Sequence, residues 1–447
     1  MSDRRATPKP FSIAIAGGGI TGLCLANALV RHKIPVHVYE AAPAFTEIGA
    51  GVGLGPNAIR AMALMDQDIL RAYEACQTTN VSPAEQGRFF NFRYGMEKPS
   101  SDGMKAGELI CDVRSGSVTS SVHRARFLDQ LARLMPKEAT SFGKRISAID
   151  DEGEGVVLSF ADGTQAKHDA VVGCDGIKSR VRRLLLGETD GASLPVFSGK
   201  YCYRGLAPAD KAIELLGEQM ASESQMYLGR PGHVLTTLIE QGKTVNVVAY
   251  TTKEDGKWED PEWVKSASKE EMLGNFHGWS KPVEDILHLV EKPNMWALFD
   301  HPPAKTYHRK GKICLLGDAA HASTPHHGAG AGMGVEDALI LTKLLAAVDS
   351  KTELEDVFAT YDAIRRPRTQ RLVTSSRKLG EIYDFQDQTI GDNMGAMGNY
   401  LAHAWDWIWN EDLTQHLGKA EKLLTVARQK GITQPKGVRV REAPPRV

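Results

Sequence analysis

The chain has 447 residues, too many for one ordinary hydrophobic core, so two or more closely packed domains are expected. Its 54 basic and 55 acidic residues give a formal net charge of -1, which disfavours nucleic acid or an anionic membrane as a partner. The six cysteines are scattered without a CxxC pair, which is typical of reduced cysteines in the cytoplasm, and no apolar run approaches the ~20 residues of a membrane span.

Residues 12–39 have the pattern of a β-α-β unit. Two short apolar segments, 12–16 and 36–39, predict strands, and the periodicity of residues 21–32 predicts a helix between them. Such a unit is the usual beginning of a nucleotide-binding sheet.

A glycine motif lies at the first strand–helix junction of this unit. Gly17, Gly19 and Gly22 form G-x-G-x-x-G, in which the glycines permit a tight turn, approach to a pyrophosphate and close helix packing. Glu40 ends the second strand at close to the ~20-residue distance expected of a carboxylate that binds an adenosine ribose hydroxyl. The motif therefore predicts a dinucleotide at the helix N-terminus, and Glu40 favours FAD or NAD over NADP.

The segments that follow extend this domain. An amphipathic helix is predicted from about residue 123 to residue 135, and residues 156–160 and 170–173 are predicted strands around an Asp-Gly hairpin turn at 161–164.

The composition changes at about residue 197. From there to residue 296 the chain is rich in Val, Thr and Tyr strands, with an acidic helical stretch at 269–276, which indicates a substrate domain. A buried strand at 312–316 and a long helix after Gly334 then return to the first domain, which is therefore discontinuous.

Signals near the C-terminus predict helices and a tail. Thr352 and Glu355 have capping-box spacing and predict a helix through Asp362, which Pro367 should kink or end. The basic, proline-bearing residues 434–447 have no periodicity and predict a disordered tail.

Two further motifs follow predicted strands. Gly-Cys-Asp-Gly at 173–176 leads into Ser-Arg-Val-Arg at 179–182, although Asp175 alone would suggest ordinary helix capping. Leu-Gly-Asp-Ala-Ala-His at 316–321 precedes the glycine-rich run 325–334, whose backbone N–H groups can approach a planar ligand at a helix start. A helix N-terminus there would stabilise negative charge on such a ligand.

With these three motifs in order, the sequence resembles the flavoprotein aromatic hydroxylases from residue 12 to about residue 371, and most nearly the salicylate hydroxylases and fungal phenol monooxygenases. The resemblance implies an α/β fold: a discontinuous Rossmann-like FAD-binding domain with an inserted β-sheet-rich substrate domain and C-terminal helices. The predicted division is FAD-binding domain 1–195 and 299–375, substrate-binding domain 196–298, C-terminal helical region 376–433 and tail 434–447.

The resemblance also assigns residues to the cofactor. Glu40 is expected at the adenosine ribose, Arg124 at the phosphate–sugar region, Gly53 in a mobile flavin-side loop at 47–53, and Asp318 at the ribityl chain. The complete predicted FAD site comprises Gly17, Gly19, Gly22, Glu40, Gly53, Arg124, Asp175, Gly317, Asp318, Gly330 and Ala331. Because no second G-x-G-x-x-G with a following acid is present, NADH or NADPH is expected to dock only transiently.

Three residues of the inserted domain are candidates for substrate contact. Arg204 can pair with a phenolate or carboxylate, although a salt-bridged sheet arginine is the ordinary alternative. His233 has a pKa range suited to removing a phenol proton, although most lone strand histidines are structural. Thr237 stands where dearomatising relatives have tyrosine, which weighs against a dearomatising outcome.

The residues Pro325, His326 and His327 complete the predicted catalytic set. His321, His326 and His327 could suggest a metal, but no carboxylate or cysteine completes a ligand set at metal-like spacing, and Pro325 separates the first histidine from the other two. We therefore expect no metal, and expect these residues to shape the pocket near the flavin.

The resemblance implies an enzyme that oxygenates a small phenolic substrate with O2 and NAD(P)H through a flavin C4a-hydroperoxide, with decarboxylation to a catechol if the substrate is salicylate. A cytoplasmic monomer or homodimer is expected. A dearomatising hydroxylase of a polyketide phenol, a flavin reductase that does not oxygenate and a non-catalytic binding protein of the same fold remain open alternatives.

Overall fold

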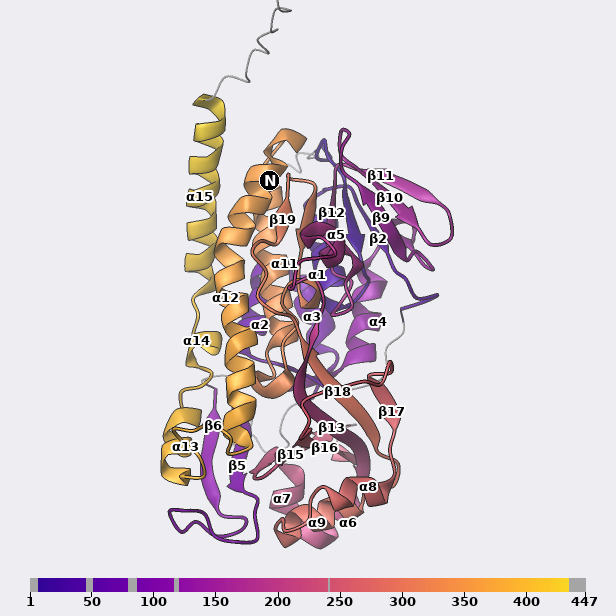
Figure 1. The fold of residues 1–447 in the computed structure, drawn as a ribbon. Coiled ribbons are helices and arrows are strands. Elements are labelled where there is room, and N and C mark those ends of the chain that lie inside the picture. The colour runs from indigo at the N-terminus through magenta and orange to yellow at the C-terminus, as the bar shows by residue number, and fades with distance from the viewer. Residues whose placement is uncertain (1–6, 46–50, 79–86, 116–119, 240–241, 434–447) are drawn as a thin grey trace, which may run out of the picture.

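The computed structural model describes residues 7–45, 51–78, 87–115, 120–239 and 242–433. One lobe is built on a largely parallel sheet and the other on a large, mostly antiparallel sheet (Figure 1). The helix α12 (Leu354–Tyr383) runs along both lobes, and α15 (Leu413–Thr433) packs against it beside the first lobe.

The predicted β-α-β unit is confirmed, with β1 at Ile13–Ala16, α1 at Ile20–Arg31 and β2 at Val36–Tyr39. Both β2 and β12 pair with β1 in parallel. Every residue of β1 and β12 is buried, as expected of a parallel sheet covered on both faces. The six strands lie in the order β19 (His308–Arg309), β20 (Ile313–Leu315), β12 (Ala170–Gly173), β1, β2 and β8 (Thr140–Ser141).

Helices of this lobe pack around the sheet and against one another. The tightest contacts join α11 (Gly330–Ala346) to α1 and to α2 (Pro56–Met65). The others are α3 (Gln67–Glu74), α4 (Arg124–Leu134), α5 (Arg180–Leu186), α10 (Asp318–His321) and a 3-10 turn at Lys137–Ala139. A small sheet contains β3 (Gly51–Leu54), β7 (Ser120–His123) and β4 (Gln77–Thr78).

Among the described residues, the second lobe contains an eight-stranded sheet whose longest strand, β13 (Val196–Pro208), lies third from one edge. Two of its strands, β5 and β6, come from a segment of the chain that the predicted division places in the first domain. The order is β17 (Val264–Ser266), β18 (Asn294–Asp300), β13, β16 (Thr244–Thr252), β15 (Gly232–Ile239), β14 (Gln225–Leu228), β5 (Arg88–Tyr94) and β6 (Leu109–Arg114).

One face of this sheet is covered by short helices that share its apolar core. They are α6 (Ala209–Leu216), α7 (Glu218–Ser222), α8 (Lys269–Gly274) and α9 (Lys281–His288). A further core, rich in aromatic residues, joins β5 to α12 and to α13 (Met394–Leu401) and α14 (Asp406–Trp409).

The predicted hairpin around the turn at 161–164 has a different second strand. In the structure β10 (Val156–Phe160) pairs with β11 (Gln165–His168) and with β9 (Ile146–Asp150), not with the segment 170–173. The reason is burial: β11 has an alternating, partly exposed pattern suited to an edge, whereas β12 is fully buried and takes the place beside β1.

The helix does not end at Pro367, because α12 continues through it to Tyr383. On either side, Arg365 and Arg368 form buried ion pairs with Glu336 of α11. These tertiary contacts hold the helix against the local effect of proline, which removes one backbone hydrogen bond.

The predicted capping box also lies elsewhere. Ser350 and Glu353 form it, and not Thr352 and Glu355: Ser350 Oγ accepts from the Thr352 N–H and Glu353 Oε2 accepts from the Ser350 N–H. A 3-10 turn at Lys351–Glu353 then leads into α12. Two other predicted segments, 47–50 of the flavin-side loop and the tail 434–447, lie outside the described residues.

Candidate active site

The glycine motif has the geometry that a dinucleotide loop requires. Gly17 has φ of +101° and lies against the Cys174 carbonyl, and a Cβ at Gly22 would collide with the Gly17 carbonyl. At Gly19, the N-cap of α1, a Cβ would meet nothing within 4 Å. The first and third positions are therefore closed by packing, and the middle position is open at the helix N-terminus, where a pyrophosphate would bind.

Glu40 lies beside this loop and is held by it. Its Oε2 accepts from the Gly18 N–H at 2.7 Å and its Oε1 from the Ala42 N–H at 2.7 Å. Each carboxylate oxygen keeps a further lone pair, so the side chain can also accept a ribose hydroxyl.

Asp175 also lies beside Gly17, but its carboxylate caps α5. Its oxygens accept from Ser179 Oγ at 2.5 Å and from the Arg180 and Val181 N–H groups at 2.8 and 3.1 Å. Burial raises the pKa of Asp175 against these hydrogen bonds. The structure thus gives it the capping role, which fixes the loop against Gly17, and its contact with the cofactor stays a prediction.

Two glycines of the later motifs, Gly317 and Gly334, pack against one side chain of the first glycine motif. Thr21 of α1 lies against both Gly317 and Gly334, where any Cβ would collide with its hydroxyl. The Gly317 N–H donates to Asp337 Oδ2 at 3.1 Å, which fixes the start of α10. Close packing of these small residues brings α1, α10 and α11 to one point.

Asp318 is exposed although its neighbours from Ile313 to His321 are buried or nearly so. It lines a cavity together with Gly330 and Ala331, at the N-terminus of α11. Gly53 lines the same cavity from β3, with its Cβ position 3.8 Å from the Gly328 carbonyl. An acceptor, a helix N-terminus and side-chain-free backbone therefore surround one space, and they fit a ribityl chain and a flavin ring.

The backbone around Arg124 places this residue next to the flavin-side strand β3. It is the first residue of α4 and directly follows β7, in which His123 pairs with Gly51 of the flavin-side strand. Its predicted phosphate contact stays a prediction.

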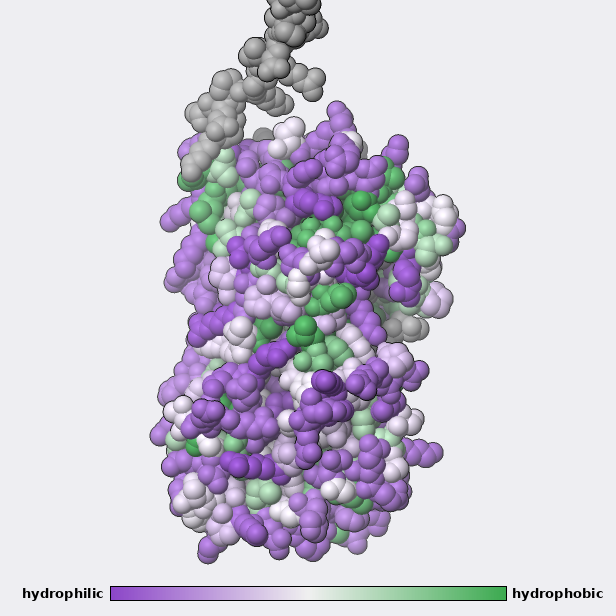
Figure 2. Space-filling view, in the orientation of Figure 1, coloured by the Kyte–Doolittle hydropathy of each residue, from purple (hydrophilic) through white to green (hydrophobic). Residues whose placement is uncertain are grey.

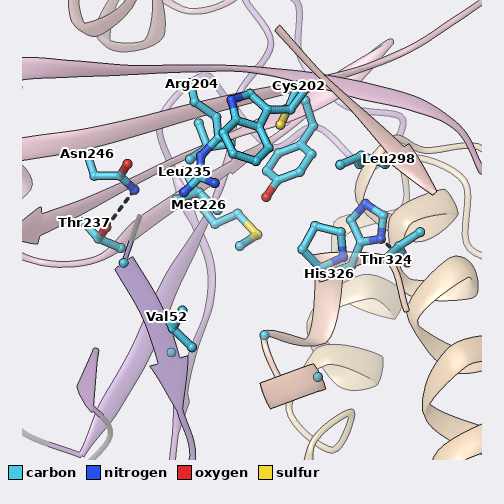
Figure 3. Close-up of a pocket in the computed structure, with 18 of the residues that line it drawn as sticks. Val52, Cys202, Arg204, Met226, Leu235, Thr237, Asn246, Leu298, Thr324 and His326 are labelled. Atoms are coloured by element: carbon cyan, nitrogen blue, oxygen red, sulfur yellow. Dashed lines mark hydrogen bonds between the residues drawn. The ribbon is translucent and has the colours of Figure 1, made fainter. Parts of the chain in front are cut away.

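The cavity has a volume of about 580 Å³ and lies between the two lobes. Of the predicted catalytic residues, Arg204, His233, Thr237, Pro325 and His326 line it. Figure 3 shows that Arg204, Thr237, Leu298 and His326 come from different elements around one space. Much of the remaining wall is apolar and includes Val52, Phe89, Met226, Leu235, Val248, Trp296 and Phe299.

His327 is the exception, since it does not line this cavity. Its Nδ1 is 3.1 Å from Ser376 Oγ, its carbonyl accepts from Trp405 Nε1, and burial lowers its pKa to about 4. It is a buried neutral histidine at the end of the turn Pro325–His327.

The sheet register explains why the substrate candidates share a face. Arg204 pairs with Val248, His233 with Tyr250 and Thr237 with Asn246. Since alternate residues of a strand point to one face, these side chains form successive rows across β13, β15 and β16. Asn246 Nδ2 donates to Thr237 Oγ1 at 3.3 Å, which makes a polar pair in one row (Figure 3).

Arg204 lacks the salt bridge that would make it an ordinary sheet arginine. Its guanidinium lies over the Trp296 ring at 5.1 Å, and within the described ranges no carboxylate pairs with it. The cavity wall therefore carries a cation whose guanidinium N–H groups can bind an anion.

Two buried imidazoles lie side by side in the wall, with 5.4 Å between the ring centroids of His233 and His326. His326 Nδ1 is 3.0 Å from the Ser376 carbonyl, which can only accept, so this nitrogen carries the proton and Nε2 is an unpaired acceptor. Burial, reinforced by His233 and Lys200, holds the pKa of His326 well below its ordinary value.

Sequence reasoning missed the groups behind His233. Its Nδ1 is 2.7 Å from Asp384 Oδ1, its ring stacks on Tyr250 at 4.3 Å, and Tyr383 approaches it edge-on. Lys200 forms an ion pair with the same Asp384. No local motif marks Asp384 or Lys200. Of the groups around His233, only Tyr250 could have been predicted, from the strand pattern around it.

Across the described part of the chain, no group of three His, Cys, Asp or Glu side chains is arranged to hold a metal ion. Among those residues, too, no helix is both long and apolar enough to cross a bilayer.

Comparison with known proteins agrees with this geometry. Residues 11–376 match the family described as FAD binding domain. The chain is 40% identical over 407 residues to 6-methylsalicylate 1-monooxygenase of Aspergillus terreus, covering 90% of both chains, and 39% identical over 434 residues to a salicylate hydroxylase of Pseudomonas putida, covering 94% of this chain and 96% of that protein. A solved salicylate hydroxylase substrate complex superimposes with a TM-score of 0.82 at 32% identity, covering 92% of this chain and 98% of the other.

Proposed function

This chain belongs to the FAD-binding domain family and is an FAD-dependent aromatic monooxygenase, and from this premise we propose that its substrate is a phenol with a neighbouring carboxylate, of the salicylate type. The supporting observation is Arg204, a guanidinium in the cavity wall with no carboxylate partner among the described residues. A cation in a mostly apolar cavity favours an anionic substrate, because a charge beside apolar surface is unfavourable without a partner.

Bound FAD supplies hydride uptake from NADH or NADPH and the activation of O2. The residues that would hold it are Glu40 at the ribose, the α1 N-terminus at the pyrophosphate, Asp318 at the ribityl chain and the α11 N-terminus at the ring. All four positions have free acceptors or helix N-terminal backbone, as their predicted roles require.

The side chains around the cavity would bind and activate the ring. Arg204 pairs with the carboxylate through parallel N–H···O bonds and so fixes the orientation of the substrate. His233 accepts the phenol proton, which raises the electron density at the carbon to be oxygenated, and His326 Nε2 offers a second acceptor nearby. The apolar wall excludes water, so that oxygen reaches the substrate without loss of peroxide.

If oxygen enters at the carbon that carries the carboxylate, the products are a catechol and CO2. The balance is salicylate, NADH, O2 and two protons giving catechol, CO2, NAD+ and water. Salicylate and 6-methylsalicylate are the first substrates to test, because proteins similar to this chain are named for them.

The test compares four compounds on the FAD-loaded protein: salicylate, 6-methylsalicylate, phenol and benzoate. We expect the two hydroxy acids to stimulate NADH oxidation with matching O2 uptake and CO2 release, and phenol and benzoate to do so far less. Equal coupled turnover with phenol would contradict the proposed role of the carboxylate. A protein that cannot be loaded with FAD would contradict the cofactor site itself.

A further inference from the structure

Behind the cavity wall, His233 is joined to two further buried ionisable side chains, Asp384 and Lys200, to which the proposed reaction assigns no role. Lys200, Asp384 and His233 are 5%, 0% and 1% exposed. They come from β13, the C-terminal end of α12 and β15, and only His233 lines the cavity.

The hydrogen bonds among these three side chains determine which ring nitrogen of His233 carries the proton. Asp384 Oδ1 is 2.7 Å from His233 Nδ1, and its Oδ2 accepts from Lys200 Nζ and from Thr252 Oγ1. Lys200 Nζ also donates to Thr252 Oγ1 and to Gln386 Oε1, both at 2.9 Å. A carboxylate held by a lysine is an acceptor, so His233 Nδ1 carries the proton and Nε2 is the basic nitrogen.

We propose that Asp384 and Lys200 are positioning residues that act through His233. Asp384 fixes its tautomer and stabilises its protonated form. Lys200 opposes that protonation, so that the ring is neutral before it accepts a proton from the substrate. The inference rests on the proposed function, in which His233 accepts the phenol proton.

The electrostatic balance at His233 supports opposite roles for the two residues. Burial lowers the pKa of His233, Asp384 raises it and Lys200 lowers it again. Among the described residues, the other titratable groups that face the ring are Tyr250 of β16, His326 of the turn before α11 and Tyr383 of α12. Burial raises the pKa of both tyrosines, so that they stay neutral.

A comparison of the two imidazoles points to His233 as the one that takes the proton. His326 Nδ1 faces a carbonyl and a threonine hydroxyl, neither of which carries charge, whereas His233 Nδ1 faces a carboxylate. An imidazolium is more stable beside an anion, and two imidazolium ions at 5.4 Å would repel each other. The pair can therefore take up one additional proton, and His233 Nε2 is the nitrogen that accepts it.

The experiment uses a nitro-substituted salicylate, whose phenolate absorbs at a longer wavelength than its phenol. It is bound to the FAD-loaded protein well below the pKa of the free phenol, so that phenolate forms only when a protein group takes the proton. The measured quantity is the ratio of bound phenolate to bound phenol, obtained from difference spectra without turnover.

We expect Asp384→Asn to lower this ratio about tenfold, which is one unit of pKa, because the imidazolium loses its anion. Lys200→Met should raise the ratio several-fold, because the opposing charge is gone. If Lys200→Met does not retain FAD, the double variant with Asp384→Asn replaces it, since it leaves no unpaired buried charge, and its ratio should exceed that of Asp384→Asn alone.

The matched control is Asp300→Asn. Asp300 is also a buried carboxylate bonded to a cation of α12, Arg377, but it does not line the cavity. Its variant should keep the wild-type ratio. Equal ratios in wild type, Asp384→Asn and the Lys200 variants would overturn the inference, whereas failure of the wild type to bind the probe would contradict the proposed function itself.

Discussion

The imidazole of His326 lies directly on Gly380 of α12: a Cβ at Gly380 would come within 2.5 Å of Cε1 and 2.7 Å of Nδ1. The same ring lines the cavity and bonds to the Ser376 carbonyl one turn earlier in the helix. The helix therefore sets the depth of His326 in the cavity, and glycine is the residue that permits this contact.

Gly380→Ala should displace His326 and lower coupled turnover at least tenfold. Alanine favours a helix by about 1 kcal/mol over glycine, but the clash in a packed site costs about 1–3 kcal/mol, so the unfolding midpoint should fall slightly or stay level. Steady-state kinetics with parallel thermal unfolding measures both effects. Unchanged kinetics would show that the ring moves without consequence.

Arg204→Ala should weaken binding of hydroxy acids while FAD content stays unchanged. A charge-assisted hydrogen bond contributes about 1.5–3 kcal/mol, so KM for salicylate should rise about tenfold to a hundredfold. Phenol, which has no carboxylate, serves as the internal control and should be affected much less. A parallel loss for both compounds would assign Arg204 to the architecture of the sheet and not to the carboxylate.

Asp318→Ala should reduce the affinity for FAD without unfolding the protein, because its side chain is exposed and accepts no hydrogen bond from another described residue. Loss of a hydrogen bond between a charged acceptor and a ribityl hydroxyl corresponds to about 1.5–3 kcal/mol, or roughly tenfold to a hundredfold in Kd. Titration of the apoprotein by flavin fluorescence measures it. Asp349→Ala, another exposed carboxylate far from the site, is the control.

Acid sensitivity should come from two buried carboxylates of α11, Glu336 and Asp337. Burial would raise the pKa of Glu336 and of Asp337, but Arg365 and Arg368 beside Glu336, and His321 and Arg365 beside Asp337, outweigh it and hold both at about 2. Their ordinary values are 4.5 and 3.8, so this contribution to stability is present above about pH 4.5 and is lost as pH falls toward 2.

Arg365→Met should therefore destabilise the protein by about 3–5 kcal/mol at pH 7, because it leaves two buried carboxylates without their main partner. The difference from wild type should shrink at pH 3, where protonation removes part of the advantage. Urea unfolding at both pH values tests this. Arg366→Met, which breaks a half-exposed pair with Asp362, should change stability by about 1 kcal/mol or less.

Prediction from sequence succeeded where the signal is local. The β-α-β unit, the strand at 312–316 and the long helix after the glycine run were found because apolar periodicity and glycine spacing act over a few residues. It failed where a helix end was expected at Pro367 and at the second strand of the hairpin, where ion pairs or burial between distant segments override local preference.

By itself, the sequence determined the glycine turns of the predicted FAD site, since the turns at Gly17 and Gly317 depend on a few consecutive residues at a strand end. Only the tertiary structure decided how His233 is tuned. Asp384 lies 151 residues from His233, and Lys200 comes from a third element. A hydrogen bond between residues so far apart in the sequence forms only in the tertiary structure, and residue spacing does not predict it.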